Sequence, residues 1–135
     1  MKLPKFLRFH RNTIRQWLIV AGILTLRFEP TLFAAGVVVA VFGAFARLWC
    51  KGFLTQRVAL ATSGPYAYTR NPFYFANLIL DCGIGLMIGR VEVFAPYLVM
   101  WFHLHHRRIL EEEKTLEESF GEAYRAYKAA VPRLW

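Results

Sequence analysis

Four apolar runs separated by short charged stretches are the feature that most constrains the fold of this chain. The runs cover roughly residues 14–26, 31–46, 72–89 and 93–104. Hydrophobic residues make up 56% of the chain and charged residues only 19%, and the charges are bunched between the runs. A soluble protein of this size would distribute its charges over its whole surface. The pattern therefore predicts an all-α, polytopic membrane helix bundle.

The number of membrane spans depends on how the two shorter runs are interpreted. A spanning helix needs about 20 apolar residues, within a range of about 17 to 25, and only the second and third runs approach this length. The first and fourth runs reach it by including Arg15, Gln16, His103 and His105, whose side chains can extend to the interface. We expect about four transmembrane helices plus a short C-terminal cytoplasmic helix. The alternative for the first run is a helix lying in the membrane interface.

The distribution of the seventeen Lys and Arg residues predicts the orientation. Five precede or open the first run, four lie between the second and third runs, and six follow the fourth run, whereas the other two loops hold only Arg27 and Arg90. Cytoplasmic loops carry the excess of Lys and Arg. Both termini and the middle loop should therefore be cytoplasmic in a multi-pass integral membrane protein, with a bacterial inner membrane as the expected location. The net charge of +8 then reflects topology and attraction to anionic lipid, not nucleic-acid binding.

Turn and helix signals divide the chain within a single domain, 1–135. We expect a helical hairpin over 13–49, a cytoplasmic loop over 50–71 and a second helical part over 72–135. Asn71 is a favoured N-cap residue and Pro72 suits a first helical turn. Gly121 fits a left-handed helix end, and a last short helix should cover 122–130. No small-residue cleavage site follows Leu26, so the basic, apolar N-terminal segment is expected to be retained.

Two polar clusters adjoin the apolar runs on the same predicted side of the membrane. The first extends from Gly64 to Tyr74 and includes Arg70, and the second extends from Arg107 to Glu113. Polar groups this close to a membrane usually bind something. Arg70 and the first turn of the following helix would attract an anion. The alternatives are an interfacial anchor for Arg70 and surface salt bridges for the pairs Arg107–Glu111 and Arg108–Glu112.

Two further polar features are less decisive. His103, His105 and His106 invite a metal hypothesis, but no further donors fall at ligand spacing on that face, so we expect interfacial histidines and no metal site. Asp81 falls within the third apolar run. It either lines a substrate tunnel or forms a buried hydrogen bond with a neighbouring helix.

The ordered set of motifs from about residue 43 onward resembles the isoprenylcysteine carboxyl methyltransferase family, which is grouped with the phospholipid methyltransferases. The matching residues are Arg47-Leu48-Trp49, Gly64-Pro65-Tyr66, Arg70-Asn71-Pro72-Phe73-Tyr74, Glu112-Glu113, Leu116, Phe120-Gly121, Tyr124, Tyr127 and Val131-Pro132-Arg133. The resemblance implies a small polytopic membrane enzyme that uses S-adenosyl-L-methionine to methylate a lipophilic acceptor arriving from the lipid bilayer. It also implies that 72–135 is the cofactor-binding half.

The resemblance assigns roles to individual residues. It implies a cofactor site formed by Tyr66, Arg70, Asn71, Pro72, Tyr74, Glu112 and Glu113, with Arg70, Asn71, Arg108 and Glu112 as catalytic candidates. Many relatives have His where this chain has Asn71 and Gly where it has Ala76. A mechanism that needs a histidine base at position 71 therefore does not apply.

Two other functions remain open on sequence grounds. Membrane sterol reductases that use NADPH look similar at the C-terminal end, with an acidic pair, an aromatic-glycine step and spaced tyrosines. A non-catalytic membrane scaffold that retains the fold is the second alternative, and the Asn71 departure is its main support. The sequence does not identify the methyl acceptor or the oligomeric state.

Overall fold

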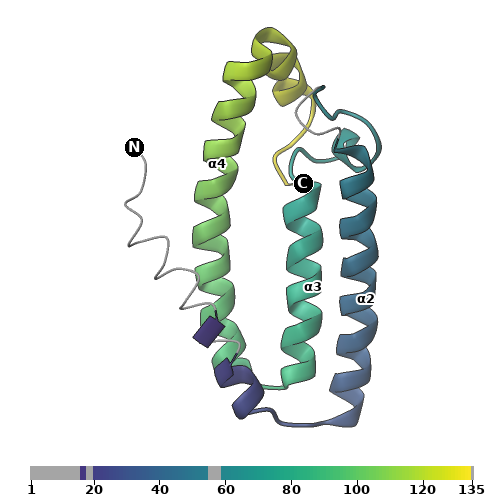
Figure 1. Cartoon of the computed structure of the whole chain (residues 1–135), viewed down its shortest axis with the longest axis vertical. Coiled ribbons are helices and arrows are strands. Elements are labelled where there is room, and N and C mark those ends of the chain that lie inside the picture. Colours follow the sequence, from purple (N-terminus) through teal and green to yellow (C-terminus); the bar gives the residue numbers. More distant parts are fainter. Residues whose placement is uncertain (1–15, 18–19, 55–58, 135) are drawn as a thin grey trace.

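The computed structural model describes residues 16–17, 20–54 and 59–134, and in these residues it is all-α. The long helices are α2 (Pro30–Phe53), α3 (Pro72–Ile88) and α4 (Val91–Ala130), and a short 3₁₀ helix, η1, covers Gly64–Ala67. Figure 1 shows α2, α3 and α4 running side by side along the length of the molecule. The all-α prediction is confirmed for the described part of the chain. The basic segment that opens the sequence lies outside the described residues.

Glycines bring α2 and α3 into close contact. A Cβ atom added at Gly83 of α3 would lie 2.4 Å from the backbone nitrogen of Ala40, and one added at Gly43 of α2 would lie 2.5 Å from that of Leu80. Such distances are too short for a real side chain, so the two backbones meet where the side chains are absent. Small residues at helix interfaces are typical of membrane bundles, in which packing and not water exclusion drives association. The pair α2 and α3 therefore forms the rigid wall of the fold.

A tight turn joins α3 to α4 at one end of the molecule. Gly89 ends α3 with φ 66°, a left-handed conformation that glycine adopts without strain. The Arg27 backbone nitrogen donates to the Ile88 carbonyl at 3.1 Å, and Arg90 Nε donates to the Thr25 carbonyl at 2.7 Å. These bonds connect the turn to the segment before α2. Gly89 therefore closes the turn between α3 and α4.

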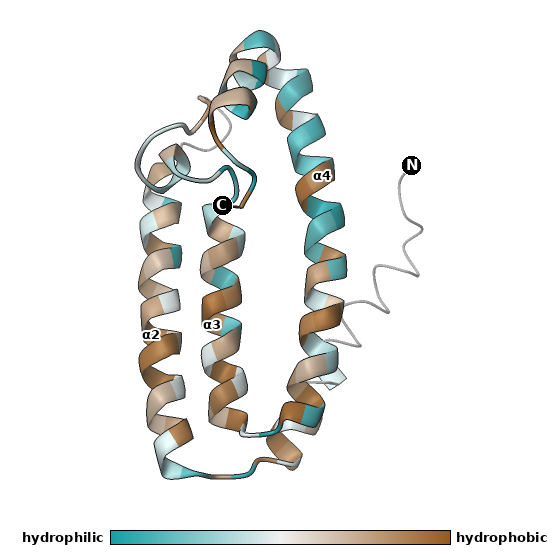
Figure 2. Cartoon of the chain, turned by 180° about the vertical axis from the view of Figure 1, so that it is seen from behind, coloured by the Kyte–Doolittle hydropathy of each residue, from teal (hydrophilic) through white to brown (hydrophobic). Residues whose placement is uncertain are grey.

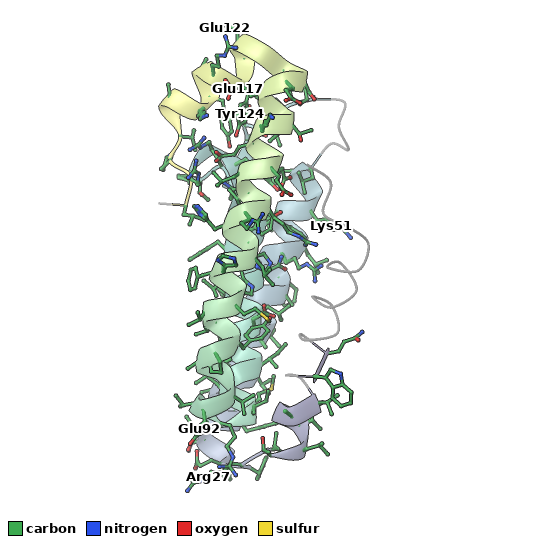
Figure 3. The ribbon with its side chains drawn as sticks, turned by 90° about the vertical axis from the view of Figure 1, so that its left-hand side faces the viewer. Arg27, Lys51, Glu92, Glu117, Glu122 and Tyr124 are labelled. Atoms are coloured by element: carbon green, nitrogen blue, oxygen red, sulfur yellow. The ribbon has the colours of Figure 1, made fainter. Side chains whose placement is uncertain are left out.

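Helix α4 is longer than α3. It extends past the level at which α3 begins and then folds back. Its 40 residues are interrupted at Gly121, where φ is 51° and ψ is −121°. The predicted helix break at Gly121 is confirmed, and the residues after it return so that the C-terminal end lies beside the beginning of α3 (Figure 1). Figure 3 shows Glu117, Glu122 and Tyr124 at this end, with Arg27 and Glu92 at the opposite end. We call the end where α2 stops and α3 starts the polar end.

One helix of the described residues, α2, is long and apolar enough to cross a membrane, with 24 residues and a mean hydropathy of 2.0 over an 18-residue window. Val38, Phe42 and Phe45 of α2 are more than 60% exposed, an apolar outer face suited to lipid. Helix α3 is apolar but has only 17 residues. Figure 2 shows α4 changing from apolar at its start to hydrophilic toward the polar end. The predicted count of four spans is therefore not established.

The first apolar run is described only in part. Residues 20–24 are helical and residues 18–19 lie outside the described set. The interfacial and spanning alternatives for this run both remain. Part of the middle loop, residues 55–58, also lies outside the described residues.

Candidate functional site

A cavity of about 570 Å³ lies between α3 and α4. Its lining comes from the end of α2, the middle loop, η1, α3 and α4. The structure brings both predicted polar clusters to this cavity. The predicted site residues that line it are Tyr66, Arg70, Asn71, Tyr74, Arg108, Glu112 and Glu113. Pro72 is the exception, since it is a buried residue of the first turn of α3 outside the lining.

Arg70 and Glu113 form the buried centre of the charged wall. Arg70 Nη1 lies 3.3 Å from Glu113 Oε1, and the two side chains are only 9% and 6% exposed. The Arg133 guanidinium donates two hydrogen bonds to the same carboxylate, from Nε to Oε1 at 3.0 Å and from Nη2 to Oε2 at 2.9 Å. Burial alone would raise the pKa of Glu113, but the Arg133 hydrogen bonds and the charge of Arg70 outweigh it and hold the pKa below its usual value. Glu113 is therefore ionised between two guanidinium groups.

The C-terminal tail is attached to the chain just before α3. The Pro132 carbonyl accepts from the Arg70 backbone nitrogen at 2.9 Å. The Arg133 carbonyl accepts from Thr69 Oγ1 at 3.0 Å and from Asn71 Nδ2 at 3.1 Å. Asn71 does occupy the N-cap position of α3, but its side chain makes no capping hydrogen bond there. The predicted cap was wrong in its chemistry, because the amide binds the tail and not the helix.

Glu112 and Arg108 belong to the cavity and not to a surface ion-pair ladder. Tyr74 Oη donates to Glu112 Oε2 at 2.9 Å, which connects the first turn of α3 to α4. Among the described residues, neither Arg107–Glu111 nor Arg108–Glu112 forms an ion pair. The salt-bridge alternative is therefore wrong for both pairs, since Glu112 turns toward Tyr74.

An aromatic group on α4 forms the next part of the wall, and its residues are not among the predicted site residues. The rings of Trp101 and His105 stack at 4.1 Å with planes 17° apart, and Tyr74 meets His105 edge-on at 5.4 Å. His105 Nδ1 lies 2.8 Å from the Trp101 carbonyl oxygen, which only accepts, so Nδ1 carries a proton. Helical spacing is the signal that would have found them, because residues 101, 105, 108 and 112 share one face of α4.

The other two histidines of that run lie elsewhere. His103 and His106 are exposed and do not line the cavity. Within the part of the chain that the structure describes, no three His, Cys, Asp or Glu side chains are grouped as metal ligands.

The tyrosines of the returning helix attach it to the body of the protein. Tyr127 Oη donates to the Tyr66 carbonyl of η1 at 2.6 Å, and burial raises the pKa of Tyr127 to about 12. Tyr124 is 1% exposed, and burial raises its pKa as well. Both side chains also border the cavity. Tyr127 therefore attaches the returning helix to η1, and both tyrosines contribute to the cavity wall.

Ala76, where many members of the family that the chain resembles have glycine, belongs to the core beneath the loop. It is 2% exposed and clusters with Cys50 and Tyr66. Its methyl group therefore fills space between α2, η1 and α3 and does not face the cavity. The alanine at position 76 therefore affects the packing of the core and not the lining of the cavity.

Asp81 forms the hydrogen bond with a neighbouring helix that the sequence offered as one of two alternatives. Its Oδ2 accepts a hydrogen bond of 2.7 Å from Tyr97 Oη of α4. Both residues also line the cavity, at the part farthest from the polar end. The cavity thus has a charged, aromatic part near the polar end and a more apolar part that contains one carboxylate.

These features define an α-helical protein of membrane type, with one long lipid-compatible helix and a binding cavity between two others. The chain belongs to the phospholipid methyltransferase family, whose model matches residues 17–123. It is 28% identical to the cobalt-zinc-cadmium resistance protein CzcN of Cupriavidus metallidurans, over 98% of this chain and 68% of that protein.

Relatives named protein-S-isoprenylcysteine O-methyltransferase also match. The human protein is 30% identical over 86% of this chain and 40% of its own length. The Schizosaccharomyces pombe protein is 36% identical over 54% of this chain and 31% of its own length. The chain thus spans less than half of either of these two relatives. No solved structure matches the chain.

Proposed function

We propose that the protein is an S-adenosyl-L-methionine-dependent methyltransferase that acts on a lipophilic acceptor at the cytoplasmic face of a membrane. The observation that carries this proposal is the cavity between α3 and α4, which gathers cationic, anionic and aromatic side chains from two segments distant in sequence. Membership of a methyltransferase family supports the reaction type. The names of the O-methyltransferase relatives support a lipid-modified acceptor.

The side chains near the polar end fit the chemical groups of this cofactor. Its carboxylate requires a cation, which Arg108 supplies, and its ribose hydroxyls or ammonium require an acceptor, which Glu112 supplies. Arg70 Nε is buried and has no hydrogen-bond partner among the described residues, so it offers a second donor for an anion. The faces of Trp101 and Tyr74 suit an adenine ring or a sulfonium.

When bound, the cofactor supplies an activated methyl group with its own leaving group. The residues of the chain therefore need to bind, orient and exclude water, and correct alignment is worth about 7 to 11 kcal/mol of barrier at best. Tyr74 fixes the position of Glu112, and Glu113 fixes Arg70 through the ion pair. Asn71 holds the C-terminal tail over the polar end and supplies no base. Tyr124 and Tyr127 contribute to the cavity wall near the polar end.

The distribution of basic residues supports a cytoplasmic position for the polar end. The cofactor is water-soluble and would enter there. A lipophilic acceptor would enter from the bilayer, beside the exposed apolar side chains of the helices.

Calorimetry with the demethylated product, S-adenosylhomocysteine, tests the proposal on the purified protein. We expect binding to the wild type and a loss of about tenfold or more in Glu112→Ala and Arg108→Ala, because hydrogen bonds to charged groups contribute about 1.5 to 3 kcal/mol. Glu118→Ala is the matched control, since Glu118 is an exposed carboxylate of the same helix outside the cavity. It should bind like the wild type. No binding to the wild type, or equal binding to all variants, would contradict the proposal.

A further inference from the structure

We propose that Arg133 is a positioning residue that keeps the hydrogen-bond donors of Arg70 available to an anion in the cavity. The identity of that anion rests on the proposed function, under which it is the carboxylate of the cofactor. Both arginines reach the same acceptor, Glu113, from distant parts of the chain. Arg133 acts by occupying Glu113, so that the carboxylate attracts Arg70 and does not take its donors.

The two guanidinium groups contact Glu113 in different ways. Arg133 donates to Oε1 at 3.0 Å and to Oε2 at 2.9 Å, in the fork geometry that arginine forms with a carboxylate. Arg70 Nη1 lies 3.3 Å from Oε1 but makes no hydrogen bond there. Each oxygen of Glu113 therefore already accepts from Arg133, and Nη1 of Arg70 interacts with the carboxylate through its charge.

Arg70 consequently retains buried donors that no side chain satisfies. Its Nε and Nη1 atoms have no hydrogen-bond partner among the described residues, and its side chain is only 9% exposed. Tyr124 Oη, from another residue of the cavity lining, is a further buried polar atom in the same condition. Buried polar groups are nearly always satisfied in folded proteins, so these atoms mark a place where a ligand or water binds. The charge of Arg70 makes an anion the fitting ligand.

The backbone of the C-terminal tail places Arg133 beside Arg70. The Arg133 carbonyl accepts from Thr69 Oγ1 and from Asn71 Nδ2, the two neighbours of Arg70 in the sequence. The Arg70 backbone nitrogen donates to the Pro132 carbonyl at 2.9 Å. The tail is thus fixed to the segment that carries Arg70, and this attachment brings the Arg133 side chain to the shared carboxylate.

Removal of Arg133 should change what Arg70 binds. Glu113 would lose two hydrogen bonds, and a buried carboxylate requires replacements for them. Arg70 is already in ion-pair contact with Glu113 and can supply the same fork. Its donors would then bind Glu113, and a ligand in the cavity would lose a contact to its anionic group.

Two ligands that differ in one carboxylate test this role: S-adenosylhomocysteine and its decarboxylated analogue, S-adenosylthiopropylamine. Calorimetry on the purified full chain gives both dissociation constants, and their ratio does not depend on the folded fraction of the sample. We expect the preference for S-adenosylhomocysteine to fall about tenfold in Arg133→Gln, because a hydrogen bond to a charged group is lost. Arg133→Lys keeps the charge but cannot form the fork, so it should lower the preference about threefold.

Arg125→Gln is the matched control. Arg125 is an exposed arginine of the returning helix that pairs with Glu117 and Glu122 outside the cavity. This variant should keep the preference of the wild type. An unchanged preference in Arg133→Gln overturns the positioning role, and so does equal weakening of both ligands, which a merely structural tail would give. If Arg133→Gln fails to fold, Arg133→Lys decides in the same way.

Melting temperatures without ligand separate this inference from the proposed function. Because Arg70 should take over Glu113 when Arg133 is absent, the loss caused by Arg70→Gln should be about twofold larger in the Arg133→Gln background than in the wild type. Equal losses in the two backgrounds overturn the inference whether or not the cofactor binds. Absence of S-adenosylhomocysteine binding to the wild type contradicts the proposed function instead.

Discussion

Arg70, Glu113 and Arg133 show how far individual residues were predictable. The sequence placed Arg70 and Glu113 at one site because both flank apolar runs on the same predicted side of the membrane. It did not reveal that they pair with each other, or that Arg133 would return from the end of the chain to share the carboxylate. Such contacts depend on the kink at Gly121, whose direction is not encoded in local spacing. The sequence thus indicated the site and missed the internal pairing.

Glu113→Gln should destabilise the protein strongly. The variant leaves two guanidinium groups facing each other without their shared anion, and breaking a buried ion pair costs about 3 to 5 kcal/mol. A clearly lower melting temperature in detergent is the expected result. The matched control is Glu118→Gln, because Glu118 and Lys114 form an exposed pair worth about 0 to 1 kcal/mol. Equal melting temperatures for the two variants would contradict the role of Glu113.

The stability difference between the wild type and Glu113→Gln should depend on pH. The folded-state pKa of Glu113 lies below its unfolded value, so its stabilising contribution is complete above about pH 5 and is lost as pH falls through the lowered folded pKa. The stability difference between wild type and Glu113→Gln should shrink under acid conditions. Melting temperatures measured from about pH 7 down to about pH 3 test this, and a constant difference would count against it.

Helix boundaries were the best-predicted feature at the scale of elements. The beginning of α3 at Pro72, its end at Gly89 and the break at Gly121 all follow from proline and glycine chemistry. The capping hydrogen bond expected from Asn71 is absent, because its amide donates to the tail instead. The close packing of α2 on α3 was also missed, since its glycines were not recognised as an interface.

Gly83→Ala should separate α2 from α3. The new methyl group would overlap the α2 backbone at Ala40, and overpacking of this kind costs about 1 to 3 kcal/mol. Gly52→Ala is the matched control, because it adds the same methyl group to an exposed position of α2 with open space around it. Thermal unfolding should show a loss of stability for position 83 and none for position 52. A control as unstable as Gly83→Ala would exclude helix contact as the cause.

At the scale of the whole molecule, the composition was sufficient to predict the fold class but not the number of membrane spans. The described residues are all-α, as the apolar runs indicated. Span length was ambiguous because the apolar start of α4 continues into a polar helix without a break. Among the described helices, only α2 is both long enough and apolar enough to span. The sequence predicted that two polar clusters meet at one site. Predicting the aromatic wall at Trp101 and His105 would also have required knowing which face of α4 lines the cavity.

The topology can be tested with single cysteines at the two ends of α4. In a background with Cys50→Ala and Cys82→Ala, we expect Glu92→Cys to react with a membrane-impermeant maleimide on intact cells. Glu118→Cys should react only after lysis, because the polar end is proposed to be cytoplasmic. Labelling is read by mass spectrometry. Reaction of both positions on intact cells, or of neither, would contradict a membrane crossing by α4.

Ultraviolet cross-linking with radiolabelled S-adenosyl-L-methionine shows where the cofactor lies. We expect label, displaced by excess S-adenosylhomocysteine, in peptides that contain the cavity residues Tyr66 to Tyr74 and Trp101 to Glu112. Label confined to other peptides, or not displaced by the competitor, would show that the cavity between α3 and α4 is not the cofactor site.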